Sequence, residues 1–90
     1  MMYPFMTLDD ETEIVHSDFH ADGSVDVYIE KADEIHGFHH MTVVLPRYEI
    51  RENVGFSDEE VERYEEIVRS TAHLIMEFSR EGGLDNAAGF

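Results

Sequence analysis

The chain has 90 residues, which is enough for one modest hydrophobic core and no second domain. Its hydrophobic content of 42% argues against wholesale disorder, and the absence of cysteine excludes disulfides and thiolate metal sites. The formal net charge of −15, from 21 acidic and 6 basic residues, disfavours direct binding to nucleic acids and to acidic membrane surfaces.

Strand-like segments separated by turn residues follow one another through the first 50 residues. The expected strands are Tyr3–Leu8, Thr12–His20, Ser24–Ala32 and Phe38–Ile50. Alternation is clearest in the third segment, where Val25, Val27 and Ile29 point to one face. Pro46 cannot donate a backbone hydrogen bond to a sheet, so the fourth strand must lie at an edge, bend or break at that residue.

The segment Asp18–Asp26, with the sequence DFHADGSVD, has two possible structures. Its acidic residues and Gly23 partly match an EF-hand calcium loop. His20 occupies a ligand position, however, and Ile29 stands where a bidentate glutamate is needed. Both flanks are also expected to be strands, whereas a calcium loop needs helices. The sequence therefore favours a β-hairpin tip at this place.

The turn residues predict a register for this hairpin, which spans Thr12–Ala32. A three-residue turn at residues 21–23, with Gly23 in the left-handed region, pairs His20 with Ser24. A one-residue slip would send every side chain to the other face, so burial should hold the strands in this register. The side chains expected to share the buried face are Val15, Phe19, Val25, Val27 and Ile29.

A long amphipathic helix is expected at the end of the chain. Ser57 followed by Glu60 is typical of a capping box, and Gly82 is typical of a helix C-terminus. His73 lies beside the apolar stripe, so we expect it to be partly buried and hydrogen-bonded. The stripe itself consists of Val61, Tyr64, Ile67, Val68, Thr71, Leu74, Ile75 and Phe78.

These elements predict an α+β fold in the order β-β-β-β-α. An antiparallel four-stranded meander is covered on one face by the single C-terminal helix. Residues 1–83 form one domain, and residues 84–90 form a C-terminal tail. One helix is narrow for four strands, and an apolar strip left uncovered around Phe38, Met41 and Tyr48 would favour a homodimer or another partner.

The histidines raise the question of a metal site. A loop at Gly37 would bring His36 near His39, whereas His39 and His40 point to opposite faces of a regular strand. The spacings match no metal-binding template, so we expect solvent-facing histidines and no cofactor. The alternative is a metal-dependent enzyme or metal-binding protein that uses His36, His39 and His40.

Catalytic motifs are missing from the sequence. It contains no cysteine nucleophile, no GxSxG motif and no glycine-rich phosphate loop. Its serines have no recognisable base, and paired carboxylates are expected by chance at this composition. The sequence therefore favours a non-enzymatic protein, with an acid–base or histidine mechanism as the alternative.

The beginning of the predicted helix, SDEEVERYEE, is strongly acidic. The helix dipole explains the acids of the first turn, and pairs with Arg63 or Arg69 contribute only about 0.2–0.5 kcal/mol each. An acidic stripe remains after this pairing, and we expect it to bind a basic protein partner. The glutamates expected to make that contact are Glu59, Glu62, Glu65 and Glu66.

Three segments, YPFMTLDDETEIVHS, GFSDEEVERYEE and STAHLI, resemble parts of small acidic bacterial proteins that remain uncharacterised. The resemblance covers most of the chain and brings no activity and no functional residues with it. Small size and acidity are also typical of antitoxins and other accessory proteins, an analogy of class only. The chain has no membrane-spanning run and no secretory signal pattern, so we expect a cytoplasmic protein-interaction module of the antitoxin or inhibitor kind.

Overall fold

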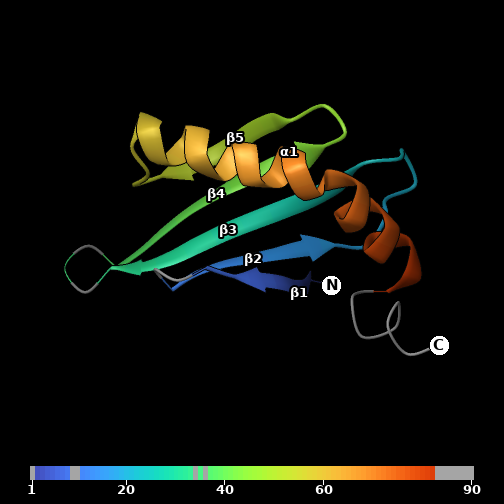
Figure 1. Ribbon diagram of the computed structural model, residues 1–90, viewed down its shortest axis with the longest axis horizontal. Coiled ribbons are helices and arrows are strands. Elements are labelled where there is room, and N and C mark those ends of the chain that lie inside the picture. Colours follow the sequence, from blue (N-terminus) through green and yellow to red (C-terminus); the bar gives the residue numbers. More distant parts are fainter. Residues whose placement is uncertain (1, 9–10, 34, 36, 83–90) are drawn as a thin grey trace.

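The computed structural model describes residues 2–8, 11–33, 35 and 37–82. Its elements are β1 (Met2–Thr7), β2 (Thr12–Ser17), β3 (Val25–Asp33), β4 (Gly37–Leu45), β5 (Glu49–Val54) and α1 (Asp58–Glu81). The strands form one antiparallel sheet in the order β1-β2-β3-β4-β5, and α1 lies against one face of it (Figure 1). The α+β class and the meander followed by a helix are confirmed, but the sheet has five strands instead of four. The predicted tail, residues 84–90, lies outside the described residues.

The expected fourth strand is in fact two strands. Residues 46–48 form a turn, and β5 returns antiparallel to β4, with Val43 opposite Ile50. Pro46 therefore breaks the strand, which is one of the three outcomes that its missing N–H allows. Tyr48 takes a left-handed φ of 59° in the same turn. All side chains of β5 are exposed, so its sequence shows no alternation that would have marked it as a separate strand.

The buried face of β2 is the opposite of the predicted one. Ile14 and His16 are 1% and 0% exposed, whereas Val15 is only half-buried. Ile14 lies opposite Ile29, and His16 lies opposite Val27, one residue away from the predicted register. The prediction that Val15 joins the core face was therefore wrong.

The tip of this hairpin nevertheless has the predicted form. The His20 N–H donates to the Ser24 carbonyl at 2.9 Å, and Gly23 has a φ of 86°. Between the tip and the paired strands, the Ser17 hydroxyl accepts a hydrogen bond from the Asp26 N–H at 2.9 Å. A side chain thus satisfies a backbone donor, and the pairing shifts by one residue. The turn prediction was correct locally, but it could not be extended into the strands.

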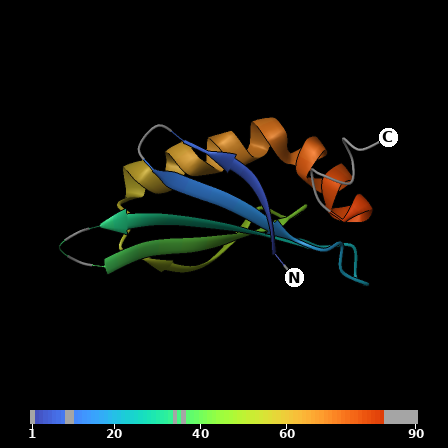
Figure 2. The same ribbon diagram turned by 90° about the horizontal axis from the view of Figure 1, so that it is seen from below.

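The core lies between α1 and the sheet, and Figure 2 shows these two layers from another side. The helix packs on β2, β3 and β4. Tyr64 is 0% exposed; its hydroxyl lies 3.2 Å from Thr12 Oγ1, and its ring packs edge-on against Phe56. The buried core residues are Ile14, Val25, Val27, Ile29, Met41, Val43, Leu45, Phe56, Tyr64, Val68 and Ile75.

The two ends of α1 are as predicted. The Glu60 N–H donates to Ser57 Oγ at 3.2 Å, and the Ser57 N–H donates to the Glu60 carboxylate at 3.1 Å, which completes the capping box. Gly82 ends the helix with a left-handed φ of 84°. His73 is exposed, so the prediction of a partly buried histidine was wrong. Ala72 and Leu74, on either side of it in the chain, are half-buried, whereas His73 itself lies on the solvent side.

Candidate functional site

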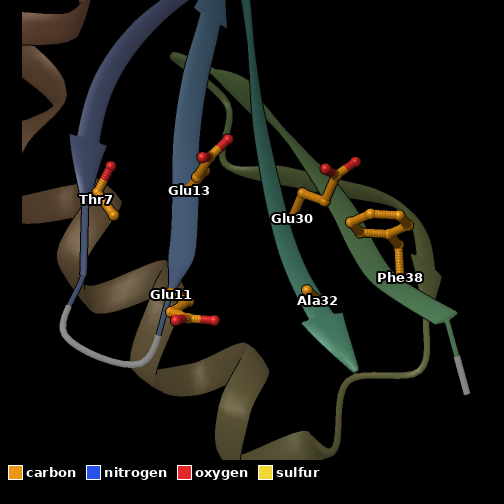
Figure 3. A pocket seen from close by; sticks show the side chains of 6 residues that line it. All are labelled: Thr7, Glu11, Glu13, Glu30, Ala32 and Phe38. Carbon is orange, nitrogen blue, oxygen red and sulfur yellow. The ribbon is translucent and has the colours of Figure 1, made fainter. Parts of the chain in front are cut away.

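The sheet face that α1 does not cover carries a hollow near the β3–β4 turn. Its volume is about 320 Å³, and Figure 3 shows the side chains that line it. We call it the acidic hollow, and it is lined by Thr7, Glu11, Glu13, Glu30, Ala32 and Phe38. Antiparallel sheets often leave one face to water, so an uncovered face alone is ordinary. The identity of the side chains on this face makes it a candidate site.

Two glutamates in the acidic hollow occupy directly opposed positions on neighbouring strands. Glu13 of β2 lies opposite Glu30 of β3, and Figure 3 shows both projecting from the uncovered face. Directly opposed residues have Cβ atoms about 4.5–5.5 Å apart, and like charges in this position destabilise a sheet. Lys31 lies on the α1 side, with its Nζ 3.8 Å from the Glu60 carboxylate. The predicted register would have paired Glu13 with Lys31, so this repulsive pair was missed.

Aromatic side chains adjoin the two carboxylates. The Tyr28 hydroxyl donates to Glu30 Oε2 at 3.2 Å, and its ring stacks on His40 with 5.8 Å between the centroids. Burial, followed by the hydrogen bond to Glu30, raises the pKa of Tyr28. The hydroxyl therefore stays protonated at neutral pH and remains a donor to this carboxylate.

Phe38 lies between the acidic hollow and a second one. Its side chain is 61% exposed, and it lines both hollows. We call the second the apolar hollow, which is lined by Phe38, His39, Val54 and Gly55. Gly55 has a φ of 95°, and a Cβ there would lie 2.7 Å from the His39 ring, so only glycine fits this wall. Of the three residues expected to be uncovered, Phe38 is exposed, whereas Met41 is buried and Tyr48 is partly buried.

The acidic stripe of α1 lies on the other side of the molecule. Glu65 is half-buried and accepts a hydrogen bond from the Arg69 Nη2 at 2.9 Å. The Arg69 guanidinium also lies 4.1 Å from the centre of the Tyr48 ring. One of the four glutamates predicted to contact a partner is therefore engaged within the chain. The other three, all exposed, are Glu59, Glu62 and Glu66.

The histidine cluster is only partly described, because His36 lies outside the described residues. The His39 ring packs edge-on against Phe56, and the His40 ring stacks on Tyr28 from the uncovered face. His39 and His40 thus point to opposite faces, as the strand geometry requires, and cannot hold one ion together. Within the described ranges, no group of three or more acidic or histidine side chains is arranged to hold a metal ion.

A serine, a histidine and an aspartate meet at the hairpin tip. His20 Nε2 lies 3.2 Å from Ser17 Oγ and 3.3 Å from Asp26 Oδ2. In a catalytic triad the serine and the acid contact different nitrogens of the histidine. Here they share one nitrogen, and the Ser17 hydroxyl already donates to the Asp18 carbonyl at 2.9 Å. These contacts therefore stabilise the hairpin tip, and their geometry is not that of an activated serine nucleophile.

His16 is a buried histidine, contrary to the expected exposure. Its Nδ1 lies 2.9 Å from the Ser17 carbonyl, and its ring packs between Tyr3 and Phe5. Its Nε2 is buried, with no hydrogen-bond partner in the described part of the chain. The shifted register of β2 explains this position, because it turns His16 toward α1.

Hydrogen bonds hold two carboxyls of the hairpin in their charged form. The Tyr3 hydroxyl donates to Asp18 at 2.6 Å and lowers the pKa of that carboxyl. The Ser24 hydroxyl and N–H donate to Asp22 at 2.6 Å and 3.0 Å, and they lower its pKa as well. Both carboxyls thus resist protonation longer in the folded chain than in the unfolded chain.

Two further carboxyls behave in the same way. The Arg51 guanidinium donates to Glu49 at 3.1 Å and lowers its pKa. In the capping box, the Ser57 backbone N–H donates to the Glu60 carboxylate and lowers the pKa of Glu60. These four carboxyls have a lower pKa in the folded chain than in the unfolded chain, where it is about 4, so their ionised forms stabilise the fold. This stability is fully present above the unfolded pKa and is lost as the pH falls through the folded pKa values.

We therefore expect stability to pass through a maximum near pH 5. Below that pH, the four hydrogen-bonded carboxyls become protonated and their contribution to stability is lost. Above it, more acidic side chains are ionised, and the repulsion among them lowers the stability of the folded chain. Urea midpoints near pH 3, about pH 5.5 and about pH 8 should be highest in the middle, and added salt should help at pH 8. A midpoint that rises steadily to pH 8 at low salt would show that self-repulsion is unimportant.

No protein-family model matches the chain, and no curated protein or solved structure is significantly similar to it. Among the described residues, no helix is long and apolar enough to cross a membrane. A functional conclusion therefore depends on the geometry and charge of the surfaces described above.

Proposed function

We propose that the protein is a non-enzymatic interaction module that binds a basic protein partner, as an antitoxin or inhibitor does. The observation that carries this proposal is the direct opposition of Glu13 and Glu30 on the uncovered face. A lysine or arginine side chain placed between them would replace a repulsion by two charge-assisted contacts. Such a pair is costly in the free protein and favourable in a complex.

The total charge supports the same conclusion. A net charge of −15 on 90 residues produces a negative field that attracts basic proteins. The exposed glutamates of α1, Glu59, Glu62 and Glu66, extend this field to the side opposite the acidic hollow. Complementary fields of this kind raise association rates about 10- to 1,000-fold. The alternative, a metal site at His36, His39 and His40, lacks comparable support because His39 and His40 diverge.

Affinity capture from cell extract tests the proposal. The immobilised protein should retain one or a few basic proteins at low salt and release them at high salt, because screening weakens the attraction. An unrelated acidic protein of similar isoelectric point is the control for unspecific retention. The proposal fails if nothing is captured at low salt, or if the control retains the same proteins in the same amounts.

A further inference from the structure

We infer that the partner docks on the uncovered sheet face, at the end where the acidic and apolar hollows meet. The docking segment carries a cationic side chain next to an apolar one. This inference depends on the proposed function and locates its contact surface. It differs from the expectation drawn from the sequence, which placed the contact on the glutamates of α1.

Phe38 is the first reason for choosing this surface. A polar side chain is expected at a solvent-facing position of an antiparallel sheet, yet Phe38 is 61% exposed. Val54, which lines the same apolar hollow, is 50% exposed. Aromatic side chains are enriched in the centres of interfaces, where a partner excludes water from them. An apolar side chain of a partner would cover both residues at once.

The charge next to Phe38 indicates the chemistry of the neighbouring contact. Figure 3 shows the Phe38 ring and the Glu30 carboxylate on the same face, with Glu13 across from Glu30. A guanidinium or ammonium group in the acidic hollow would contact the carboxylates and lie close to an aromatic ring. Cations bind favourably over such rings, arginine more often than lysine. Charge complementarity therefore selects a basic segment as the occupant.

A second copy of the chain is a poor occupant of the same face. Face-to-face packing around a two-fold axis would bring two sets of Glu13 and Glu30 together. Each copy also carries a net charge of −15. The acidic stripe of α1 is a poor alternative surface. It carries a shallow hollow of its own, but three glutamates and Arg69 line that hollow and no apolar side chain does. That composition is typical of a solvated helix face.

Two synthetic peptides of equal length and charge test the inference. One alternates arginine with leucine, and the other alternates arginine with serine. In an NMR titration, the arginine–leucine peptide should bind about tenfold more tightly and shift the amides around Glu13, Glu30 and Phe38. Phe38→Ser should abolish the preference for leucine, since it removes the exposed ring. Thermal melts of each variant establish that it is folded.

Two double variants with the same charge change give a matched comparison. Glu13→Gln with Glu30→Gln should weaken the arginine–leucine peptide about tenfold, whereas Glu62→Gln with Glu66→Gln should have little effect. The inference is overturned if Glu62→Gln with Glu66→Gln weakens binding and Glu13→Gln with Glu30→Gln does not. The proposal that the protein binds a basic partner would still hold in that case. The inference is also overturned if neither peptide binds at low salt, or if the free protein is a dimer that Phe38→Ser dissociates. The proposed function fails separately, through the capture experiment.

Discussion

Replacing Tyr64 by alanine should lower the free energy of unfolding by about 3–5 kcal/mol. Tyr64 is 0% exposed and packs edge-on against Phe56, with 5.1 Å between the ring centroids. It is fully buried in the core between α1 and the sheet, so its removal leaves a large cavity. A chain of this length has a total stability of about 5–13 kcal/mol, and the variant should therefore be close to unfolding. Urea denaturation followed by circular dichroism measures the loss.

Tyr64→Phe separates the packing of the ring from the hydrogen bond of its hydroxyl. The ring stays, and the 3.2 Å contact between the Tyr64 hydroxyl and Thr12 Oγ1 is removed. We expect a loss of about 0.5–1.5 kcal/mol, the net contribution of an ordinary hydrogen bond. A loss below about 1 kcal/mol for Tyr64→Ala would mean that α1 does not pack on the sheet as described.

Glu13→Lys should stabilise the protein and weaken its binding. The substitution turns the repulsive pair with Glu30 into an attractive one, so the free energy of unfolding should rise by about 1 kcal/mol. The same change places a positive charge in the acidic hollow, where a partner's cation is expected. Affinity for the arginine–leucine peptide should therefore fall more than about tenfold.

Two controls accompany this substitution. Glu13→Gln removes the repulsion without adding an attraction, so its gain in stability should be smaller than that of Glu13→Lys. The gain should also shrink at high salt, because both side chains lie at the surface. If Glu13→Lys destabilises the protein, the opposed carboxylates are not a source of strain, and the main support for the functional proposal is lost.

The parts of the fold that depend on neighbouring residues could be predicted from the sequence. Ser57 and Glu60 cap α1 through contacts within one turn, and Gly82 ends it through its own backbone conformation. The strands β1, β2 and β3 were expected from local patterns and turn residues, and β4 was expected only as the first part of a longer strand, Phe38–Ile50. β5 could not be predicted as a separate strand, because its six side chains are all exposed and show no period.

The candidate site depends on contacts that the sequence does not reveal. The hydroxyl of Ser17 accepts a hydrogen bond from the Asp26 N–H at the point where the pairing differs by one residue from the predicted register. That shift buries His16 and pairs Glu13 with Glu30 instead of Lys31. The turn geometry at residues 21–23 gave the correct tip and the wrong strand register. The strand register therefore decides which charges meet on the uncovered face.

The sequence also located part of the exposed surface. Phe38 is uncovered as expected, whereas Met41 lies on the α1 side of β4 and is buried. Tyr48 is covered by the guanidinium of Arg69. The acidic stripe of α1 is exposed at three of its four glutamates, and its contact with a partner stays a prediction. The uncovered sheet face is the alternative contact surface, and the two double variants distinguish it from the acidic stripe of α1.

The rate of association with the captured partner, measured against ionic strength, tests the central claim most directly. For the wild-type protein, the rate constant should fall at least about tenfold between low salt and about 0.5 M salt, because the attraction between an acidic module and a basic partner is screened. Glu13→Lys should lower the rate at low salt and flatten its dependence on salt. A rate constant that changes neither with salt nor with Glu13→Lys would contradict the proposal that these carboxylates bind a basic partner.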